Sequence, residues 1–439
     1  MNIGFISLGC SKNRVDTEVM MAALKKAGHK IVNSLERADL VIVNTCGFIT
    51  PAKEESIEAI IETAELKKKG SLQFLVAAGC LSQRYGRELL LEIPELDGVF
   101  GISSVSSMAG FVNRIAQGER ACFTEAPPTE YSEKGPRILT TPPGSAYLKI
   151  SEGCNNSCSY CVIPSIRGKL RSREINELLN EAVQLLKMGI KELVLVAQDT
   201  STYGHDISPQ PALPILLREL SKLDGLEWIR LMYLHPLYLS DDIIDVVAYE
   251  NKVLPYLDIP IQHASSKILK LMHRQHDNRH LRTMINKLRA RIPNLTLRTT
   301  VMLGFPGEEE KDFAELYEFV AESQFDWLGA FSFVPEEGSK AALMPNQIED
   351  EIKVERRDKI LRLQQKITRQ KNLARVNSRE KVLISSQLSK NLFVGRTYFQ
   401  APEVDGLTLV KTDFKLTKGD LVDVQLVGVR NYDMIGEYQ

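Results

Sequence analysis

Residues 146–163 read AYLKISEGCNNSCSYCVI, an apolar stretch with the character of a β-strand followed by three cysteines within eight positions. Cys154, Cys158 and Cys161 have C-x3-C-x2-C spacing, and no histidine or fourth cysteine lies close by. Iron–sulfur clusters are usually held by four thiolates, so three thiolates leave one iron with an open position. An open position is typical of a site that binds a substrate or cofactor. The stretch predicts such a cluster; a structural zinc site, which needs four protein ligands, is the alternative.

Strand-like and helix-like segments alternate from residue 146 to about residue 335. The expected strands cover residues 146–151, 192–198, 228–233, 256–261, 296–303 and 327–333. A closed eightfold barrel usually needs about 250 residues, so we predict a partial, six-stranded parallel (β/α)6 barrel. Barrel sites are built at the carboxyl ends of strands. We therefore expect Gln198, Gln262 and Arg298 to line the cofactor site; an internal ion pair for Arg298 and a satisfied core amide for Gln198 are the alternatives.

Residues 1–125 also alternate between short apolar strands and helices, which indicates a doubly wound parallel sheet covered on both faces. Cys10, Cys46 and Cys80 each come directly after one of these strands. Because parallel strands end at one edge of a sheet, we expect the three thiols to converge there as a second three-thiolate cluster. Three unrelated core thiols are the alternative. Cys122 fits neither set and is interpreted as a plain thiol.

Three further segments complete the organisation of the chain. Residues 126–145 are rich in Pro, Gly, Ser and Thr and are predicted to be an interdomain linker. Residues 351–375 are expected to form a helix with nine Lys/Arg and three Asp/Glu, either as a solvated face or as a surface that contacts nucleic acid. This helix ends the predicted core domain, 146–375. Residues 376–439 contain short strands bounded by Gly, Pro and Asp, which predicts a small antiparallel β-barrel.

The composition of the 439 residues is ordinary for a globular protein, with 44% hydrophobic and 25% charged residues and a net charge of −1. With a net charge this close to zero, the chain has no strong overall electrostatic field that would attract nucleic acid. No run of 18 apolar residues exists, and the first residues lack the pattern of a signal peptide, so we expect a cytoplasmic protein without a membrane partner. Seven cysteines in a chain of this size argue against a disulfide framework.

The sequence EGCNNSCSYCVIPSIRG, residues 152–168, resembles the cluster loop of the radical S-adenosylmethionine enzymes. In that family the open iron of a [4Fe–4S] cluster chelates the amino and carboxylate groups of S-adenosylmethionine, and reduction releases a 5′-deoxyadenosyl radical. The resemblance implies that the missing ligand is the cofactor. It also implies that Tyr160 lies at the aromatic position near the adenine.

The two three-cysteine sets and the terminal barrel together resemble the methylthiotransferases, whose terminal barrel is the TRAM domain. The segments SLGCSKNRVDTE (7–18), VAQDTSTYGHD (196–206) and GRTYFQAPEVDG (395–406) are most similar to members that modify an aspartate of ribosomal protein S twelve. The terminal barrel has eight Lys/Arg and eight Asp/Glu, which favours a protein partner over RNA. A tRNA-base (adenosine) methylthiotransferase on the same scaffold and a non-catalytic cluster carrier are the alternatives.

The resemblance implies two [4Fe–4S] clusters and two uses of S-adenosylmethionine. One molecule methylates a sulfur on the auxiliary cluster, and another makes the radical that removes hydrogen from the β-carbon of the aspartate. A C–S bond then forms. The implied partners are ribosomal protein S twelve, free or in the small subunit, and a reducing electron donor such as flavodoxin or ferredoxin. We expect a monomer.

Overall fold

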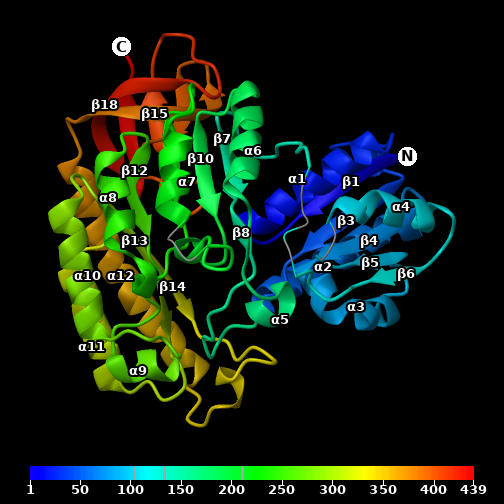
Figure 1. Cartoon of the computed structure of the whole chain (residues 1–439), viewed down its shortest axis with the longest axis horizontal. Coiled ribbons are helices and arrows are strands. Elements are labelled where there is room, and N and C mark those ends of the chain that lie inside the picture. The colour runs from blue at the N-terminus through cyan, green and yellow to red at the C-terminus, as the bar shows by residue number, and fades with distance from the viewer. Residues whose placement is uncertain (103–104, 130, 132–134, 209–211) are drawn as a thin grey trace.

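Two six-stranded sheets and a small closed barrel make up the fold (Figure 1). The computed structural model describes every residue except 103–104, 130, 132–134 and 209–211. Among the residues that it describes, no helix has the length and apolar character needed to cross a bilayer. The α/β class predicted from the sequence is confirmed.

The N-terminal sheet is parallel throughout. Its strands, in spatial order, are β2 (Lys30–Ile31), β1 (Asn2–Ser7), β3 (Leu40–Thr45), β4 (Phe74–Gly79), β5 (Gly98–Phe100) and β6 (Ala121–Phe123). Its helices are α1 (Ser11–Lys26), α2 (Thr50–Lys68), α3 (Cys80–Glu92) and α4 (Met108–Ala116). The short strands β2, β5 and β6 extend the strands that the sequence predicts before Cys10, Cys46 and Cys80.

Side-chain alternation along β3 shows why both faces of this sheet are covered. Leu40 and Ile42 pack into the core formed with α1 and α4. Val41 and Val43 pack into the opposite core, formed with α2 and α3. A strand buried on both faces is nearly continuous in apolar residues, as the sequence VIV at 41–43 is. The predicted doubly wound arrangement is confirmed.

The central sheet is a partial barrel of six parallel strands. In spatial order they are β14 (Trp327–Ser332), β13 (Thr296–Leu303), β12 (Val253–Asp258), β11 (Trp228–Leu231), β10 (Glu192–Val196) and β7 (Ser145–Lys149). The helices of this part are α5 (Ile163–Arg167), α6 (Ile175–Lys187), α7 (Ala212–Ser221), α8 (Asp241–Tyr249), α9 (Ser266–Leu271), α10 (Asn278–Arg291), α11 (Glu310–Ser323) and α12 (Asp350–Ala374). All six predicted strands are present.

The C-terminal part is a closed barrel of five strands. The strands are β15 (Arg379–Ser389), β16 (Leu392–Arg396), β17 (Thr408–Lys411), β18 (Leu421–Arg430) and β19 (Asp433–Glu437). The predicted small barrel is confirmed, with one difference: β17 and β19 pair in parallel, whereas the other pairs are antiparallel. The parallel pair closes the barrel, and the sequence did not indicate it because the whole of β18 separates β17 from β19 along the chain.

The small barrel covers the amino ends of the central strands (Figure 1). Glu192, the first residue of β10, is fully buried between two guanidiniums: Arg230 Nε lies 2.8 Å and Arg396 Nη2 2.5 Å from its carboxylate. Nearby, the indole N–H of Trp327 donates to the carbonyl of Phe399 at 2.6 Å. The amino end of the central barrel is therefore closed, and its carboxyl end is left for a site.

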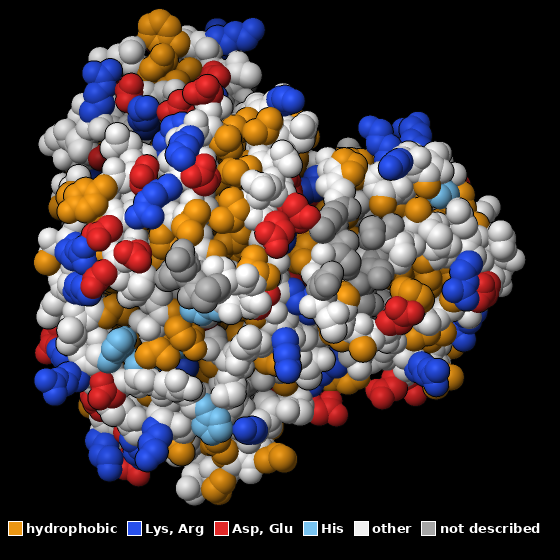
Figure 2. Space-filling model, viewed as in Figure 1, with side chains coloured by type: hydrophobic (Ala, Val, Ile, Leu, Met, Phe, Trp, Pro, Cys, Tyr) orange, Lys and Arg blue, Asp and Glu red, His pale blue; other side chains and the backbone are white. Residues whose placement is uncertain are grey.

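Helix α12 is not exposed to solvent on all sides, because one of its faces is buried. Its buried face includes Ile360, Gln364 and Ile367, which lie against the central barrel. The amide of Gln364 donates to the carbonyl of Phe325 at 2.8 Å. On the face of the molecule seen in Figure 2, Lys and Arg side chains are interspersed with Asp and Glu. On α12 itself, Lys359 pairs with Glu355, and Arg356 pairs with Glu308 and Glu310.

We predict that Glu192→Gln lowers the free energy of unfolding by about 3–5 kcal/mol, because two buried guanidiniums lose the carboxylate that both of them contact. These guanidiniums outweigh burial and hold the pKa of Glu192 at about 2, below its usual 4.5. The stabilisation is therefore complete above pH 4.5 and is lost as the pH falls toward 2. Urea unfolding followed by tryptophan fluorescence measures it, because Trp228 and Trp327 both lie at this contact.

The matched control is Glu219→Gln, which removes an exposed ion pair with Lys222. Its effect is expected to stay within about 0.5 kcal/mol of the parent chain. Equal midpoints for the Glu192 and Glu219 variants would contradict the assignment of the buried cluster as a main contact between the two barrels.

Candidate functional site

All six cysteines of the two predicted sets open onto one cavity of about 350 Å³. Three come from the carboxyl edge of the N-terminal sheet: Cys10 after β1, Cys46 after β3 and Cys80 after β4. The other three come from the loop after β7, at the carboxyl end of the central barrel. The structure thus brings the two sets face to face across the junction of two separate folds.

Close backbone packing places the N-terminal thiols. Gly79, just before Cys80, has φ = +92°, and a Cβ there would lie 2.3 Å from the side-chain oxygen of Asn44. A Cβ on Gly47 would lie 2.7 Å from the carbonyl of Cys80. Only glycine fits both positions, so the chain after β3 can approach the chain after β4. Cys80 then begins α3, and Cys10 precedes the first residue of α1, where a helix dipole favours a thiolate.

A short hairpin holds the ends of the second cysteine loop. Strands β8 (Ser151–Glu152) and β9 (Arg171–Ser172) pair antiparallel. Just inside them, the N–H of Cys154 donates to the carbonyl of Gly168 at 3.1 Å. The intervening residues therefore form a closed loop whose three thiols point into the cavity.

Every one of the six sulfurs has an N–H donor. In the second loop, Asn156 N lies 3.4 Å from Cys154 Sγ, Ile163 N 3.4 Å from Cys161 Sγ, and Arg274 Nη1 3.7 Å from Cys158 Sγ. In the N-terminal set the donors are the backbone of Lys12 and Asn13 for Cys10, the backbone of Phe48 for Cys46, and the guanidinium of Arg167 for Cys80. Such donors stabilise thiolates that ligate iron–sulfur clusters, so both sets fit that group.

The thiols differ in how easily they ionise. Burial raises the pKa of Cys80 and of Cys161 to about 12, and that of Cys154 to about 11. Cys10 is exposed. Desolvation by the surrounding protein acts to raise its pKa, but the charges of Lys12 and Arg167 outweigh this effect, and the pKa of Cys10 lies below its ordinary value. A metal that binds here must displace protons from most of its ligands.

Three of the four residues expected at the cofactor site lie on this cavity: Tyr160, Gln198 and Gln262. Tyr160 packs against the cluster that contains Phe305 and Met272. Gln198 donates to Glu152, and its buried side-chain oxygen has no hydrogen-bond partner among the residues that the structure describes. Gln262 has φ = +69°, a left-handed conformation that is uncommon outside glycine and asparagine.

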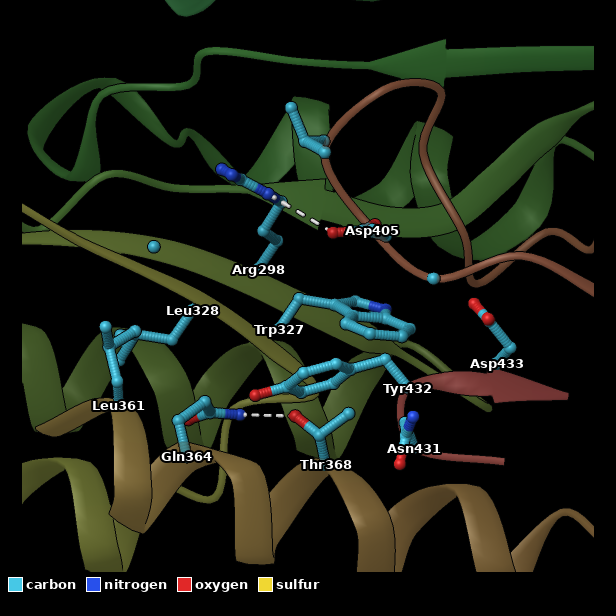
Figure 3. Close-up of a pocket in the computed structure, with 13 residues that line it drawn as sticks. Arg298, Trp327, Leu328, Leu361, Gln364, Thr368, Asp405, Asn431, Tyr432 and Asp433 are labelled. Atoms are coloured by element: carbon cyan, nitrogen blue, oxygen red, sulfur yellow. Dashed lines mark hydrogen bonds and ion pairs between the residues drawn. The ribbon is translucent and has the colours of Figure 1, made fainter. Parts of the chain in front are cut away.

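Arg298 lies elsewhere. It is the third residue of β13, near the amino end, and borders a separate cavity of about 440 Å³ beneath the small barrel (Figure 3). Its Nη1 is 2.8 Å from Asp258 and its Nε 3.4 Å from Asp405 of the small barrel. This is the internal ion pair that the sequence left open as the alternative.

The cavity also has cationic residues that the sequence analysis did not single out: Lys12, Arg167 and Arg274. The Nζ of Lys12 lies 3.7 Å above the ring of Tyr233. Lys12 and Arg167 lie two and six residues after cysteines of the two motifs, and this proximity was the available signal. Arg274 is more than 100 residues from the thiol that it contacts, and no sequence spacing indicates it.

Family comparisons divide the chain into three matched regions. Residues 2–101 match the family described as "Uncharacterized protein family UPF0004". Residues 148–320 match the radical SAM superfamily, whose members use a [4Fe–4S] cluster and S-adenosylmethionine. Residues 376–438 match the TRAM domain.

Solved structures share the fold at low identity. A radical S-adenosylmethionine methyltransferase, TsrM from Kitasatospora setae, has a TM-score of 0.57 at 14% identity and covers 78% of this chain and 74% of its own. The cobalamin-dependent radical enzyme OxsB has a TM-score of 0.53 at 10% identity and covers 82% of this chain and 56% of its own.

Curated relatives match along the whole chain. "Ribosomal protein uS12 methylthiotransferase RimO" of Syntrophomonas wolfei subsp. wolfei is 94% identical over 439 residues, covering 100% of both chains. The protein of the same name from Pelotomaculum thermopropionicum is 46% identical and covers 100% of this chain and 99% of its own. The chain therefore belongs to the methylthiotransferase family of radical S-adenosylmethionine enzymes, within the RimO group.

Proposed function

We propose that this chain inserts a methylthio group at the β-carbon of an aspartate in ribosomal protein uS12. The observation that carries the proposal is the single cavity onto which six cysteines from two folds open. The names of its full-length relatives supply the substrate. The balanced charge of the small barrel, eight Lys/Arg against eight Asp/Glu, supports a protein substrate over the alternative, a tRNA base.

Within this proposal, Cys154, Cys158 and Cys161 hold one [4Fe–4S] cluster, and Cys10, Cys46 and Cys80 hold a second. When bound, the clusters and S-adenosylmethionine supply a radical for hydrogen removal and the sulfur and methyl group that replace the hydrogen. An unactivated C–H bond has no useful acidity, so no side-chain base of this chain can perform that step.

The residues around the cavity bind and orient the reactants. Gln198 offers a donor such as the ammonium group of S-adenosylmethionine a side-chain oxygen that has no partner in the described part of the chain, and Gln262 and Tyr160 line the same cavity. Lys12 and Arg167 offset the negative charge that thiolate-bound iron brings to the cavity. The half-buried walls restrict water at the place where a radical would form.

The proposal assigns a task to each region. Residues 1–125 hold the auxiliary site, and residues 146–375 hold the cofactor and generate the radical. Residues 126–145 connect them, and residues 376–439 contact the ribosomal protein, free or in the small subunit. An external donor such as flavodoxin or ferredoxin delivers the electron, and one chain suffices because the cavity takes all its cysteines from one copy.

The first test uses protein reconstituted anaerobically with iron and sulfide, dithionite and S-adenosylmethionine. With purified uS12, peptide mass spectrometry is expected to find a gain of one methylthio group on an aspartate. With total tRNA, nucleoside analysis is expected to find no methylthioadenosine. The reverse pattern would replace this proposal by the tRNA alternative, and the absence of 5′-deoxyadenosine in both would favour a cluster carrier.

We predict a split between two cysteine variants. Cys46→Ala is expected to lose about half of the bound iron and all methylthio transfer while still producing 5′-deoxyadenosine, because only the auxiliary set loses a ligand. Cys158→Ala is expected to lose 5′-deoxyadenosine as well. Iron assay and chromatography of products measure both, and Cys122→Ala, which leaves both sets intact, is the control. Full transfer by Cys46→Ala would exclude an auxiliary cluster.

We predict that Gln198→Ala raises the Kd of S-adenosylmethionine about tenfold, because one hydrogen-bond acceptor in the cavity is lost. Its iron content is expected to stay that of the parent chain, since the side-chain amide of Gln198 donates its hydrogen bond to Glu152 and not to a cysteine. Anaerobic calorimetry measures the affinity, with Gln365→Ala on the exposed face of α12 as the control. An unchanged Kd would show that Gln198 is only a polar residue of the core.

A further inference from the structure

The side chain of Arg167 contacts residues from both sides of the cavity, the N-terminal part of the chain and the central barrel. It is the last residue of α5, six positions after Cys161, and only 1% of it is exposed. Its Nε lies 3.3 Å and its Nη2 3.2 Å from the sulfur of Cys80, which belongs to the N-terminal sheet. A side chain from the cofactor loop therefore donates two hydrogen bonds to a thiol of the other set.

Two carboxylates fix the orientation of this guanidinium. Its Nη1 lies 2.7 Å from Glu152, which belongs to the same loop, and its Nη2 lies 3.0 Å from Asp16 of α1. Its Nη2 is also 3.2 Å from the side-chain oxygen of Asn13. Because Nη1 and Nη2 both have carboxylate acceptors, the planar guanidinium is held in one orientation. In this orientation its Nε and Nη2 groups also donate to the sulfur of Cys80.

Apolar packing holds the helix that carries Arg167. Ile166 and Val162 pack with Cys80 and Ile102 in one small cluster, against which Phe48 also lies. Phe48 lies two residues after Cys46. The position of Arg167 is therefore set by contacts with two loops of the N-terminal sheet.

Among the six sulfurs, that of Cys80 alone receives two bonds from one guanidinium. The sulfurs of Cys154 and Cys161 each receive a backbone N–H group, and the guanidinium of Arg274 is farther from Cys158, at 3.7 Å. A cationic donor withdraws charge from a ligating sulfur, and reduction adds charge to the cluster. Hydrogen bonds to ligand sulfurs therefore favour the reduced state and raise its potential.

We propose that Arg167 is a positioning residue that raises the reduction potential of the iron centre bound at Cys80 relative to the same centre without it. This inference rests on the proposed function, because it assumes that Cys10, Cys46 and Cys80 bind a cluster. It assigns to one side chain of the cofactor loop control over the electronic state of the sulfur-supplying site.

The test measures the auxiliary centre alone. A parent chain carrying Cys154→Ala, Cys158→Ala and Cys161→Ala retains only the N-terminal set, and it is reconstituted with iron and sulfide. Its midpoint potential is determined by dithionite titration with EPR detection. Arg167→Met and Arg167→Lys are then introduced, and Arg137→Met is the control. Arg137 is a buried arginine that also links the two parts of the chain, pairing with Glu18 of α1 and Glu181 of α6, and among the described residues no cysteine is hydrogen-bonded to it.

Arg167→Met is expected to make reduction at least tenfold less favourable, a shift of about −59 mV for a one-electron couple. Arg167→Lys keeps the charge but loses the planar fork, so a smaller shift in the same direction is expected. Arg137→Met is expected to match the parent. An Arg167→Met potential equal to that of the control would overturn the inference, as would loss of iron from both Arg167 variants, because the role would then be assembly.

The iron content of the parent separates the two claims. If the parent binds no iron, the second cluster of the proposed function fails and this inference falls with it. If the parent binds about four irons per chain and its potential does not respond to Arg167, only the inference fails.

Discussion

Four buried charges between the N-terminal sheet and the central barrel hold the two cysteine sets against each other. Lys149 at the end of β7 lies 2.5 Å from Asp16 and 2.8 Å from Glu152, and Arg167 lies within 3.0 Å of the same two carboxylates. Among the residues that the structure describes, this network pairs two cations with two carboxylates, and burial of charges favours such pairing. Because Asp16 belongs to α1, one turn and a half after Cys10, this network fixes the auxiliary loops relative to the cofactor loop.

The opposite end of the barrel is closed by the C-terminal domain, and this determines where chemistry can occur. Glu192, Arg230 and Arg396 fill the amino end with a second charge cluster. From the same domain, Glu403 reaches Tyr147 at 3.1 Å and Arg14 of α1 at 2.6 Å. The small barrel thus contacts both other parts of the chain, and the cavity at the carboxyl ends is the place left for a cofactor and a substrate residue.

The architecture and the six cysteines could be predicted from sequence because both follow from local rules. Parallel strands end on one edge, so Cys10, Cys46 and Cys80 had to meet once the strands were recognised. Arg298 shows where this reasoning stops: it lies on the right strand but only two residues from its start, and its partner Asp405 is more than 100 residues away. Arg274 and the β19 pairing were missed for the same reason, since contacts between distant segments leave no periodic signal.

The central claim is that two incompletely ligated iron centres face one cavity. An anaerobic crystal structure of the reconstituted chain, with iron located by anomalous scattering, tests it most directly. The account predicts two iron clusters, one on Cys10, Cys46 and Cys80 and one on Cys154, Cys158 and Cys161, with no protein atom of the barrel wall between them. Iron on only one set, or a fourth protein ligand that completes either cluster, would contradict it.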